Sequence, residues 1–507
     1  MLLSAAALLL SPLSSQTVED PPRPRPSVLV FVADDLGAMD LESDNPDTFH
    51  ETPHLAQLAK EGMRFTQGYA AAPVCSPTRY ALQTGRHPAR GRATEWFGGR
   101  RVERFRGAEY NAFMALEEVT LAEALKEEGY DTFFAGKWHL GKEEGLWPEH
   151  QGYDENHGGH DRGGPYGPGK YFSPYGNPRL EDGPEGEHLP ARLARETAAF
   201  VRAHGEGGAR AGQPFFAMLS FYSVHTPLMT TPAMIDKYTE KRLEQGLTDV
   251  PDSERYAPEE QCWPTDRPRT VRVLQDNPIY AGMVETMDDA VGTVLGALEE
   301  AGLASSTLVV FTSDNGGLST SEGRPTSNLP LRGGKGWLYE GGIREPWIVR
   351  WPGVAAPGST CSAPITSQDL LPTVLEAVGA PLPAGRVIDG VSFAPCLRGE
   401  PATPRGSLVW HYPHYGNQGG FPGAALRHGD WKLIERHEDG RVHLYDLATD
   451  PGERADLAER HPEVVEELRA ELHTWYEALD ARFLRQVEKE SSPFHDLKPW
   501  RPGQAGD

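Results

Sequence analysis

Uninterrupted apolar runs recur along the chain at intervals that leave room for helices between them. These runs are rich in β-branched and aromatic side chains, and they occupy residues 27–33, 131–135, 214–221 and 307–313. Such runs are typical of strands that are buried on both faces of a parallel sheet. The intervening segments predict helices at 52–62, 120–129, 191–204 and 279–301. The alternation predicts an α/β protein with a largely parallel central sheet.

The pattern changes beyond about residue 400, where short apolar runs follow one another at hairpin spacing. Strands are predicted at 408–410, 424–427, 431–434 and 442–445, and an amphipathic helix follows at 462–484. This predicts a small C-terminal subdomain of antiparallel sheet and helix at residues 399–507, after a larger domain at 27–398. A polar segment at 230–276 is predicted to be an insertion or a lid.

The N-terminus begins with a short apolar segment. Residues 1–15 combine a leucine- and alanine-rich run with small residues suited to cleavage, although no lysine or arginine precedes the run. The run is too short to span a bilayer and is typical of a signal peptide. A proline-rich linker follows at 16–26, and no later stretch is long and apolar enough for a membrane span. The sequence therefore predicts export, to a periplasm or to the outside of the cell.

The chain is strongly acidic. Its 507 residues include 49 lysines and arginines against 73 aspartates and glutamates, which gives a formal net charge of −24. This balance argues against nucleic acid or an anionic membrane surface as a partner. A site for an anionic substrate must then be a local basic island, with the distant acidic surface partly screened by salt.

Polar residues follow two of the predicted parallel strands. Asp34 and Asp35 end the first strand, and Asp314 and Asn315 end the run at 307–313. Open α/β sheets bind their ligands at this end of the strands. An isolated Asp-Asp pair more often caps a helix or a turn. Hard oxygen ligands from two strand ends, however, would suit Ca²⁺ or Mg²⁺.

Candidate groups for anion binding follow the other strands. Lys137 and His139 lie two residues apart just after one strand, so an extended backbone points both to one side. His225 follows the run at 214–221, and Lys335 lies in a glycine-rich segment. A cation beside a titratable base at a strand end is typical of an anion site.

A loop that enters a helix carries Cys75-Ser-Pro-Thr-Arg79. A group at the start of that helix faces backbone N–H donors and the positive end of the helix dipole, which suits an anion. The Arg79 guanidinium offers a fork of donors that matches a tetrahedral oxyanion. Taken alone, such residues are more often a buried thiol and a surface arginine at a helix start.

The segment from Cys75 to Arg79, followed by Thr84-Gly85-Arg86, resembles the signature of the type I sulfatases. The other motifs described above occur in that family's order, together with His225-Thr-Pro and Gly-Gly-Lys335-Gly-Trp. The resemblance covers nearly the whole chain after the leader. It implies an alkaline-phosphatase-like α/β/α sandwich with a C-terminal antiparallel subdomain. It also implies hydrolysis of sulfate monoesters.

The resemblance further implies that a maturase oxidises Cys75 to formylglycine, whose hydrate attacks sulfur. One Ca²⁺ ion is expected to be held by the side chains of Asp34, Asp35, Asp314, Asn315 and modified residue 75. The expected catalytic residues are Cys75, Arg79, Lys137, His139, His225 and Lys335. Lys137 and Lys335 would hold the sulfate, His225 or Lys335 would protonate the leaving alcohol, and His139 would take the proton from the hydrate.

If Cys75 is consumed by this modification, Cys262, Cys361 and Cys396 allow at most one internal disulfide. The sequence does not indicate which pair would form it.

The substrate is expected to be a sulfated saccharide. The segment from Trp410 to Asn417 resembles the same region of bacterial sulfatases that act on sulfated sugars, and it makes His411 and His414 candidate substrate-binding residues. A packed aromatic hairpin is an equally good interpretation of this segment. Two other functions stay open: a phosphatase or phosphonate monoester hydrolase on the same fold, and a non-catalytic binder of sulfated glycans if Cys75 is unmodified.

Overall fold

The computed structural model describes residues 25–260, 269–488 and 494–503. The predicted signal peptide at 1–15 lies outside the described residues, as do Cys262 and all but the last two residues of the predicted linker at 16–26.

An eight-stranded sheet forms the centre of the larger domain. Its strands lie in the order β11 (Ser359–Cys361), β2 (Met63–Phe65), β10 (Ile348–Arg350), β9 (Thr307–Ser313), β1 (Ser27–Ala33), β6 (Phe215–Ser220), β4 (Asp131–Gly136) and β5 (Glu155–His157). The four apolar runs thus become the adjacent strands β9, β1, β6 and β4, which are parallel to one another. Among the described strands of this sheet, only β10 runs antiparallel to its neighbours.

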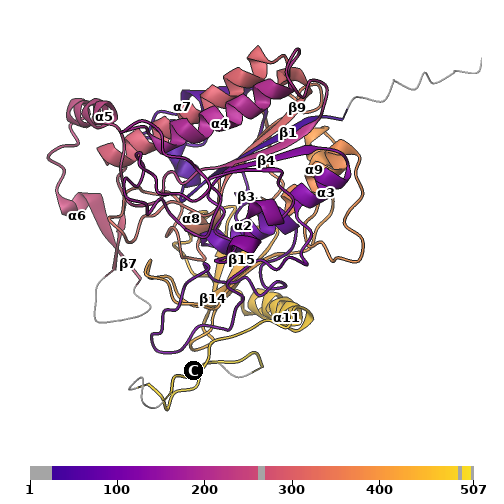
Figure 1. Ribbon diagram of the computed structural model, residues 1–507. Helices are drawn as coiled ribbons and strands as arrows, with labels where there is room; N and C mark the ends of the chain where they lie inside the picture. The colour runs from indigo at the N-terminus through magenta and orange to yellow at the C-terminus, as the bar shows by residue number, and fades with distance from the viewer. Residues whose placement is uncertain (1–24, 261–268, 489–493, 504–507) are drawn as a thin grey trace, which may run out of the picture.

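Helices cover both faces of this sheet, which confirms the predicted α/β/α sandwich (Figure 1). One face packs against α1 (Pro53–Glu61), α4 (Leu189–His204) and α7 (Pro278–Glu300). The other face packs against α2 (Cys75–Thr84), α3 (Leu121–Glu127) and α9 (Leu370–Val378).

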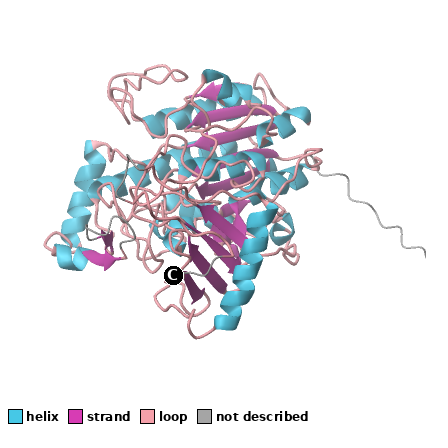
Figure 2. Cartoon of the chain, turned by 90° about the horizontal axis from the view of Figure 1, so that it is seen from below, coloured by secondary structure: helices cyan, strands magenta, loops and turns pink. Residues whose placement is uncertain are grey.

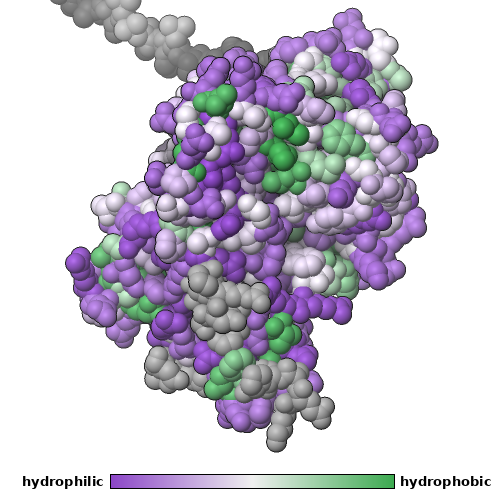
Figure 3. Space-filling model, turned by 90° about the vertical axis from the view of Figure 1, so that its left-hand side faces the viewer, coloured by the Kyte–Doolittle hydropathy of each residue, from purple (hydrophilic) through white to green (hydrophobic). Residues whose placement is uncertain are grey.

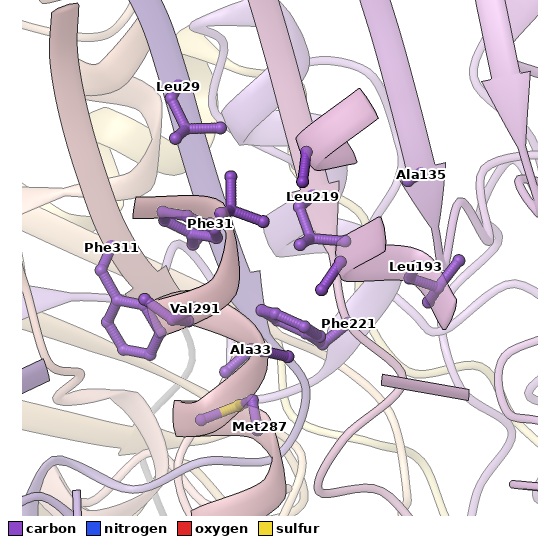
Figure 4. Packing of buried hydrophobic residues seen from close by; sticks show 14 of the residues in the cluster. Leu29, Phe31, Ala33, Ala135, Leu193, Leu219, Phe221, Met287, Val291 and Phe311 are labelled. Carbon is purple, nitrogen blue, oxygen red and sulfur yellow. The ribbon is translucent and has the colours of Figure 1, made fainter. Parts of the chain in front are cut away.

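Strand β1 explains why both faces need cover. Its side chains alternate between the faces, so that Phe31 and Ala33 pack toward α7 while Val30 packs toward α2. All residues of the strand are buried. Figure 4 shows Phe31 and Ala33 beside Val291 and Met287 of α7. A strand that is apolar at every position can only be accommodated between two layers.

The C-terminal region forms a second, antiparallel sheet of β13 (Leu408–Tyr412), β14 (Gly423–His428), β15 (Trp431–Arg436) and β16 (Val442–Asp446). Helix α11 (Pro462–Ala478) lies against it (Figure 2). The prediction of a helix to 484 was too long. The chain leaves the helix at Asp480, which has a positive φ of 50°, and Arg485 then pairs with Arg106 as an isolated bridge.

The polar segment at 230–276 contains helices α5 (Pro232–Glu244) and α6 (Asp252–Arg255), and the hairpin strands β7 (Tyr256–Glu259) and β8 (Arg269–Arg272). Helix α5 packs against α7. The remaining short elements are β3 (Gly68–Tyr69), β12 (Ile365–Thr366), α8 (Glu340–Ile343), α10 (Ala394–Leu397) and five 3₁₀ turns at Ala38–Asp40, Glu144–Leu146, Pro148–His150, Ala304–Ser306 and Ser367–Asp369.

The helices, the surface and the remaining cysteines concern two further expectations, the lack of a membrane span and the possible disulfide. None of the helices within the described residues has the length and apolar character that a bilayer span requires. The face in Figure 3 is mostly hydrophilic, with separate hydrophobic patches. Cys361 and Cys396 are both free, and their thiols are close enough that the interaction lowers the pKa of Cys361 and raises that of Cys396.

Candidate active site

The polar groups predicted at the strand ends come together at one edge of the central sheet. Strands β1 and β9 run side by side and end together, because Ala33 pairs with Ser313. Strand β6 pairs with both β1 and β4, and the turns after β6 and β4 lead to His225 and to His139. Four adjacent parallel strands therefore deliver their last side chains to the same place.

Four of these side chains supply buried oxygen atoms: Asp34, Asp35, Asp314 and Asn315, which are at most 1% exposed. The Asn315 amide donates to Asp35 Oδ1 at 2.8 Å, and the Asp35 backbone N–H donates to Asp314 Oδ1 at 3.2 Å. Asp34 Oδ1 and Asn315 Oδ1 have no hydrogen-bond partner among the described residues. Buried acceptors without a donor are unfavourable unless a cation contacts them. The pair therefore fits a hard metal ion.

Three cations balance the three carboxylates. Lys137 Nζ lies 2.7 Å from Asp34 Oδ2, and Lys335 Nζ lies 2.8 Å from Asp35 Oδ2. The formal charges of these side chains cancel once Arg79 and Asp314 are included. Burial raises the pKa of Asp34 well above its ordinary value, although Lys137 opposes this rise. Burial would also raise the pKa of Asp35, but Lys335 and then His225 outweigh it and lower that pKa below the ordinary value.

Arg79 points to the acidic cluster rather than to open space. Its Nε donates to Asp314 Oδ2 at 2.8 Å, and Nη1 donates to the Lys137 carbonyl at 2.9 Å. Nη2 lies 2.7 Å from the same Asp314 oxygen as an ion pair, but it makes no hydrogen bond with any described residue. The structure shows Arg79 holding Asp314 and the turn after β4, and the oxyanion-binding role that the sequence suggested for it stays a prediction. Arg79 thus fixes the positions of two other groups of the site.

Cys75 begins α2 and lies at the floor of a cavity, 4% exposed, with its Sγ 3.4 Å from His139 Nδ1. Burial raises the pKa of Cys75, so the unmodified group is a thiol near neutral pH. Burial, and then Lys137, lower the pKa of His139 well below its ordinary value. A neutral imidazole therefore faces position 75, where it can accept a proton.

His225 lies beside the carboxylates. Its Nε2 is 3.8 Å from Asp35 Oδ2, and its Nδ1 is 2.6 Å from the Thr226 carbonyl oxygen. A carbonyl oxygen only accepts, so Nδ1 carries the proton and Nε2 is the free nitrogen of the neutral ring. Burial, and then Lys335, lower the pKa of His225 to about 4. Ligand atoms of Asp34, Asp35 and His225 lie within 4.8 Å of one another, close enough to contact one ion.

The cavity above Cys75 has a volume of about 440 Å³, and His139, His225 and Lys335 line it. Sequence reasoning missed several of its other walls. Trp96 and Tyr166 remain 39% and 55% exposed there, in loops without periodicity that could have marked them. The lining also includes polar and charged side chains, those of Arg100, Arg101, Glu322, Asn417 and Gln418.

The structure does not bring His411 to this cavity. His411 is 3% exposed, and its Nε2 lies 2.8 Å from the Arg482 carbonyl oxygen, among the rings of Trp475, Tyr476 and Phe483. The reason is the period of a strand. Side chains alternate across β13, so His411 faces α11, while its neighbours on that strand face the larger domain.

His414 is also buried and does not line the cavity above Cys75. Its Nε2 lies 2.9 Å from Thr94 Oγ1, and its ring forms part of the wall of a neighbouring cavity. The segment that does reach the active site follows directly, from Tyr415 to Gln418.

Comparisons with known proteins agree with this geometry. The Sulfatase family model matches residues 26–380, and the model of the N-sulphoglucosamine sulphohydrolase C-terminal region matches residues 334–480. The chain is 33% identical to human arylsulfatase A, covering 88% of this chain and 86% of that protein. It is 30% identical to a sulfatase of Formosa agariphila, covering 90% and 88%.

The solved structure of Ps i-CgsB in complex with k-i-k-neocarrahexaose has a TM-score of 0.69 with this chain at 25% identity, covering 89% of this chain and 92% of that one. The α/β/α sandwich with its extra antiparallel sheet is the alkaline-phosphatase-like fold that such proteins share. From the matched family model and these relatives, the chain belongs to the type I sulfatases and is a sulfuric ester hydrolase.

Proposed function

We propose that this sulfatase hydrolyses the sulfate monoester of a carbohydrate, with residue 75 as formylglycine and with one bound Ca²⁺. The observation that carries the proposal is the position of Cys75. It lies at the floor of the cavity, 3.4 Å from a neutral His139 and at the start of α2. The side chain at this position is surrounded by the ammonium groups and carboxylates described above.

The calcium ion would be held by the oxygens of Asp34, Asp35, Asp314 and Asn315. Two of these residues carry the buried acceptors that lack a donor. When bound, the ion would supply positive charge against the charge that develops on the sulfate. Because the side chains of the site are otherwise balanced in charge, this added charge would favour an anionic substrate. Hard carboxylate and amide oxygens favour Ca²⁺ over a thiophilic ion.

Formylglycine would supply the hydrated aldehyde nucleophile, and the chain's own residues would position and deprotonate the group at residue 75. The N–H groups at the start of α2 and the helix dipole favour negative charge there. His139 Nδ1 faces the same position and would accept its proton, because burial keeps this imidazole neutral. Arg79 would hold Asp314 in place through the hydrogen bond from its Nε and the ion pair of its Nη2.

Lys335 and His225 would have different roles: Lys335 would contact the sulfate, and His225 would protonate the leaving alcohol. Burial would lower the pKa of Lys335, but Asp35 outweighs it and raises that pKa above the ordinary value. Lys335 therefore retains its proton and serves as a fixed positive charge on the sulfate. His225 releases a proton far more readily, and an anionic substrate next to it would raise its pKa. Protonated at Nε2, His225 would donate to the leaving alcohol. Lys137, whose Nζ donates to Asp34 Oδ2, would add a further positive charge that helps to hold the sulfate.

Several features of the cavity support a saccharide as the alcohol. Trp96 and Tyr166 present partly exposed aromatic rings, which suit the apolar faces of sugar rings. Glu322 accepts hydrogen bonds from Asn417 at 2.6 Å and Gln418 at 3.1 Å, and this polar group could bind hydroxyls. The similar structure of Ps i-CgsB contains a neocarrahexaose. In this proposal, Asn417 and Gln418 take the place that the sequence suggested for His411 and His414.

Co-expression with a formylglycine-generating maturase would test the proposal. We expect the peptide that contains residue 75 to show the mass of the aldehyde, and sulfate release from nitrophenyl sulfate to rise in proportion to the aldehyde fraction. Cys75→Ala should fold and release no sulfate. Full activity with an unmodified cysteine, or complete conversion without sulfate release, would contradict the mechanism.

A further inference from the structure

A second cavity adjoins the active site, and the mechanism does not use it. It has a volume of about 280 Å³ and shares Gly99, Arg100 and Arg101 with the wall of the active-site cavity. Its far wall includes Arg106 and Arg485. We propose that this cavity binds a second anionic group, a sulfate or a carboxylate, of the same saccharide whose sulfate ester lies at residue 75. This inference rests on the proposed function and deepens it.

The charge of the cavity is unusual for a protein with a net charge of −24. Four arginines line it: Arg100, Arg101, Arg106 and Arg485. Three of them have carboxylate partners, since Arg101 pairs with Glu103, Arg106 lies 3.8 Å from Glu488, and Arg485 lies 2.6 Å from Glu109. No hydrogen bond or ion pair joins Arg100 to any residue in the described part of the chain. Its guanidinium is available to a ligand.

The buried carboxyl in the wall does not offset this charge. Glu95 is buried and accepts from Tyr412 at 3.0 Å and from the Trp96 backbone N–H at 2.9 Å. Burial raises the pKa of Glu95 to about 8, so it is mainly neutral at pH 7. The other carboxylate of the lining is Glu109, which pairs with Arg485, so four guanidinium groups still give the lining an excess of positive charge.

The far wall is held in place by the backbone. Arg106 and Arg485 exchange backbone hydrogen bonds of 2.8 Å in both directions, and Arg485 Nε donates to the Gly107 carbonyl at 3.2 Å. Arg106 Nε is buried and has no hydrogen-bond partner among the residues described. Guanidinium groups with fixed directions recognise sulfate and carboxylate through paired N–H donors.

The two cavities differ in the charge that they would accept. The rim of the active-site cavity carries Glu322, a carboxylate that disfavours a further anion on that side. Gly99, Arg100 and Arg101 line both cavities, so the arginine-lined cavity is the neighbouring space on their side of the active site. A saccharide with one sulfate at residue 75 and another anionic group toward Arg106 would match the charge of both cavities. We therefore infer a substrate with at least two anionic groups, on one sugar or on neighbouring ones.

Binding can be tested without maturation, in a Cys75→Ala background that cannot turn over. The probes are hexasaccharides from carrageenan, chondroitin sulfate and heparin, each with its desulfated counterpart, measured by calorimetry at two salt concentrations. At least one sulfated hexasaccharide should bind. The Arg106→Gln/Arg485→Gln double variant should bind it roughly tenfold or more weakly, with a smaller salt dependence. Arg202→Gln is the matched control, because Arg202 pairs with Glu300 on the α4–α7 side of the sheet.

Arg100→Gln gives a second variant that breaks no contact within the described fold, and it should weaken the same hexasaccharide. Unchanged affinity in both variants would overturn the inference. So would equal binding of the sulfated and desulfated probes to the parent protein. Nitrophenyl sulfate, which has no second anion, separates the two claims. If the matured wild-type protein fails to release sulfate from it, the proposed function fails. If it is hydrolysed but the arginine variants bind hexasaccharides normally, only the second site fails.

Discussion

Among the buried clusters of charged side chains in the described part of the chain, two invite comparison, and one of these two has the features of an active site. The first is the group of carboxylates and cations beneath Cys75. The second lies where the C-terminal sheet meets the larger domain, where Lys432 Nζ contacts Glu340 Oε1 at 2.9 Å and Glu453 Oε1 at 2.8 Å. All three of these residues are 0% exposed. Burial of charge alone therefore does not identify a functional site.

The clusters differ in how they accommodate their carboxylates. At the junction, burial raises the pKa of Glu453 to about 7 against the effect of Lys432, so a shared proton can relieve the excess acid. Glu340 is further bound by the Tyr69 hydroxyl at 2.8 Å. Glu453 Oε1 also makes no hydrogen bond within the described residues, but Lys432 Nζ lies 2.8 Å from it. At the active site, Asp34 Oδ1 and Asn315 Oδ1 remain without donors next to a cavity of about 440 Å³. Unpartnered acceptors beside an open cavity mark the functional cluster.

Asp314→Asn should have the largest effect of the substitutions that test this distinction. We expect loss of bound Ca²⁺ and a fall in turnover of roughly 10³-fold or more, because the ion and Arg79 both depend on this carboxylate. Metal analysis and kcat on nitrophenyl sulfate measure the two effects. The control is Asp288→Asn, since Asp288 is equally buried but accepts only from the backbone of α1. Retention of calcium and activity in the Asp314 variant, or stoichiometric Zn²⁺ in the parent, would refute an all-oxygen calcium site.

Lys432→Met should affect stability instead of chemistry. Removal of this ammonium takes the ion-pair partner from Glu453 and leaves Glu340 with the more distant Arg344 at 3.6 Å, which destabilises the fold by about 3–4 kcal/mol. Urea unfolding measures this effect. The calcium content and kcat of the folded protein should stay at wild-type values, and adding Glu453→Gln should restore part of the lost stability. A large fall in kcat without loss of stability would mean that the junction takes part in catalysis.

His411 gives a smaller, pH-dependent test of the C-terminal side. Burial lowers its pKa to about 3, so the folded protein keeps it neutral while the unfolded chain protonates it below about 6.5. Its contribution to stability is therefore complete above pH 6.5 and is lost as the pH falls toward 3. At pH 5 the loss is about 2 kcal/mol.

The measurement for His411 is the difference in unfolding free energy between pH 7.5 and pH 5 in the wild type and in His411→Gln. The variant should show a smaller loss on acidification, with unchanged KM for a sulfated saccharide. A raised KM at neutral pH with an unaltered pH dependence of stability would instead give His411 the substrate-binding role that the sequence suggested.

The sequence predicted which polar groups would meet at the strand ends, because each lies at the end of a recognisable element. Asp34, Asp314 and Lys137 follow apolar runs, and parallel strands place their carboxyl ends at one edge, so local patterns were sufficient to predict the meeting point. Cys75 begins a helix with a proline in its first turn, which the sequence also shows.

The residues that line the cavity above Cys75 could not be predicted from such local patterns. Trp96, Tyr166 and Glu322 lie in loops, where the fold alone decides which residues meet. The period of a strand predicts that His411 and its neighbours face opposite sides, but it does not say which side faces the cavity. The arginines near residue 100 form a visible cluster in the sequence, yet their role depends on a cavity that only the folded chain defines.

The most direct test of the account compares two esters with the same leaving group. Nitrophenyl sulfate and nitrophenyl phosphate should be assayed with protein whose residue 75 is fully converted to the aldehyde. We predict that kcat/KM favours the sulfate by roughly tenfold or more and that Cys75→Ala abolishes the sulfatase rate. A preference for the phosphate, or sulfate hydrolysis that survives the substitution, would contradict the assignment of this site to sulfate ester hydrolysis through residue 75.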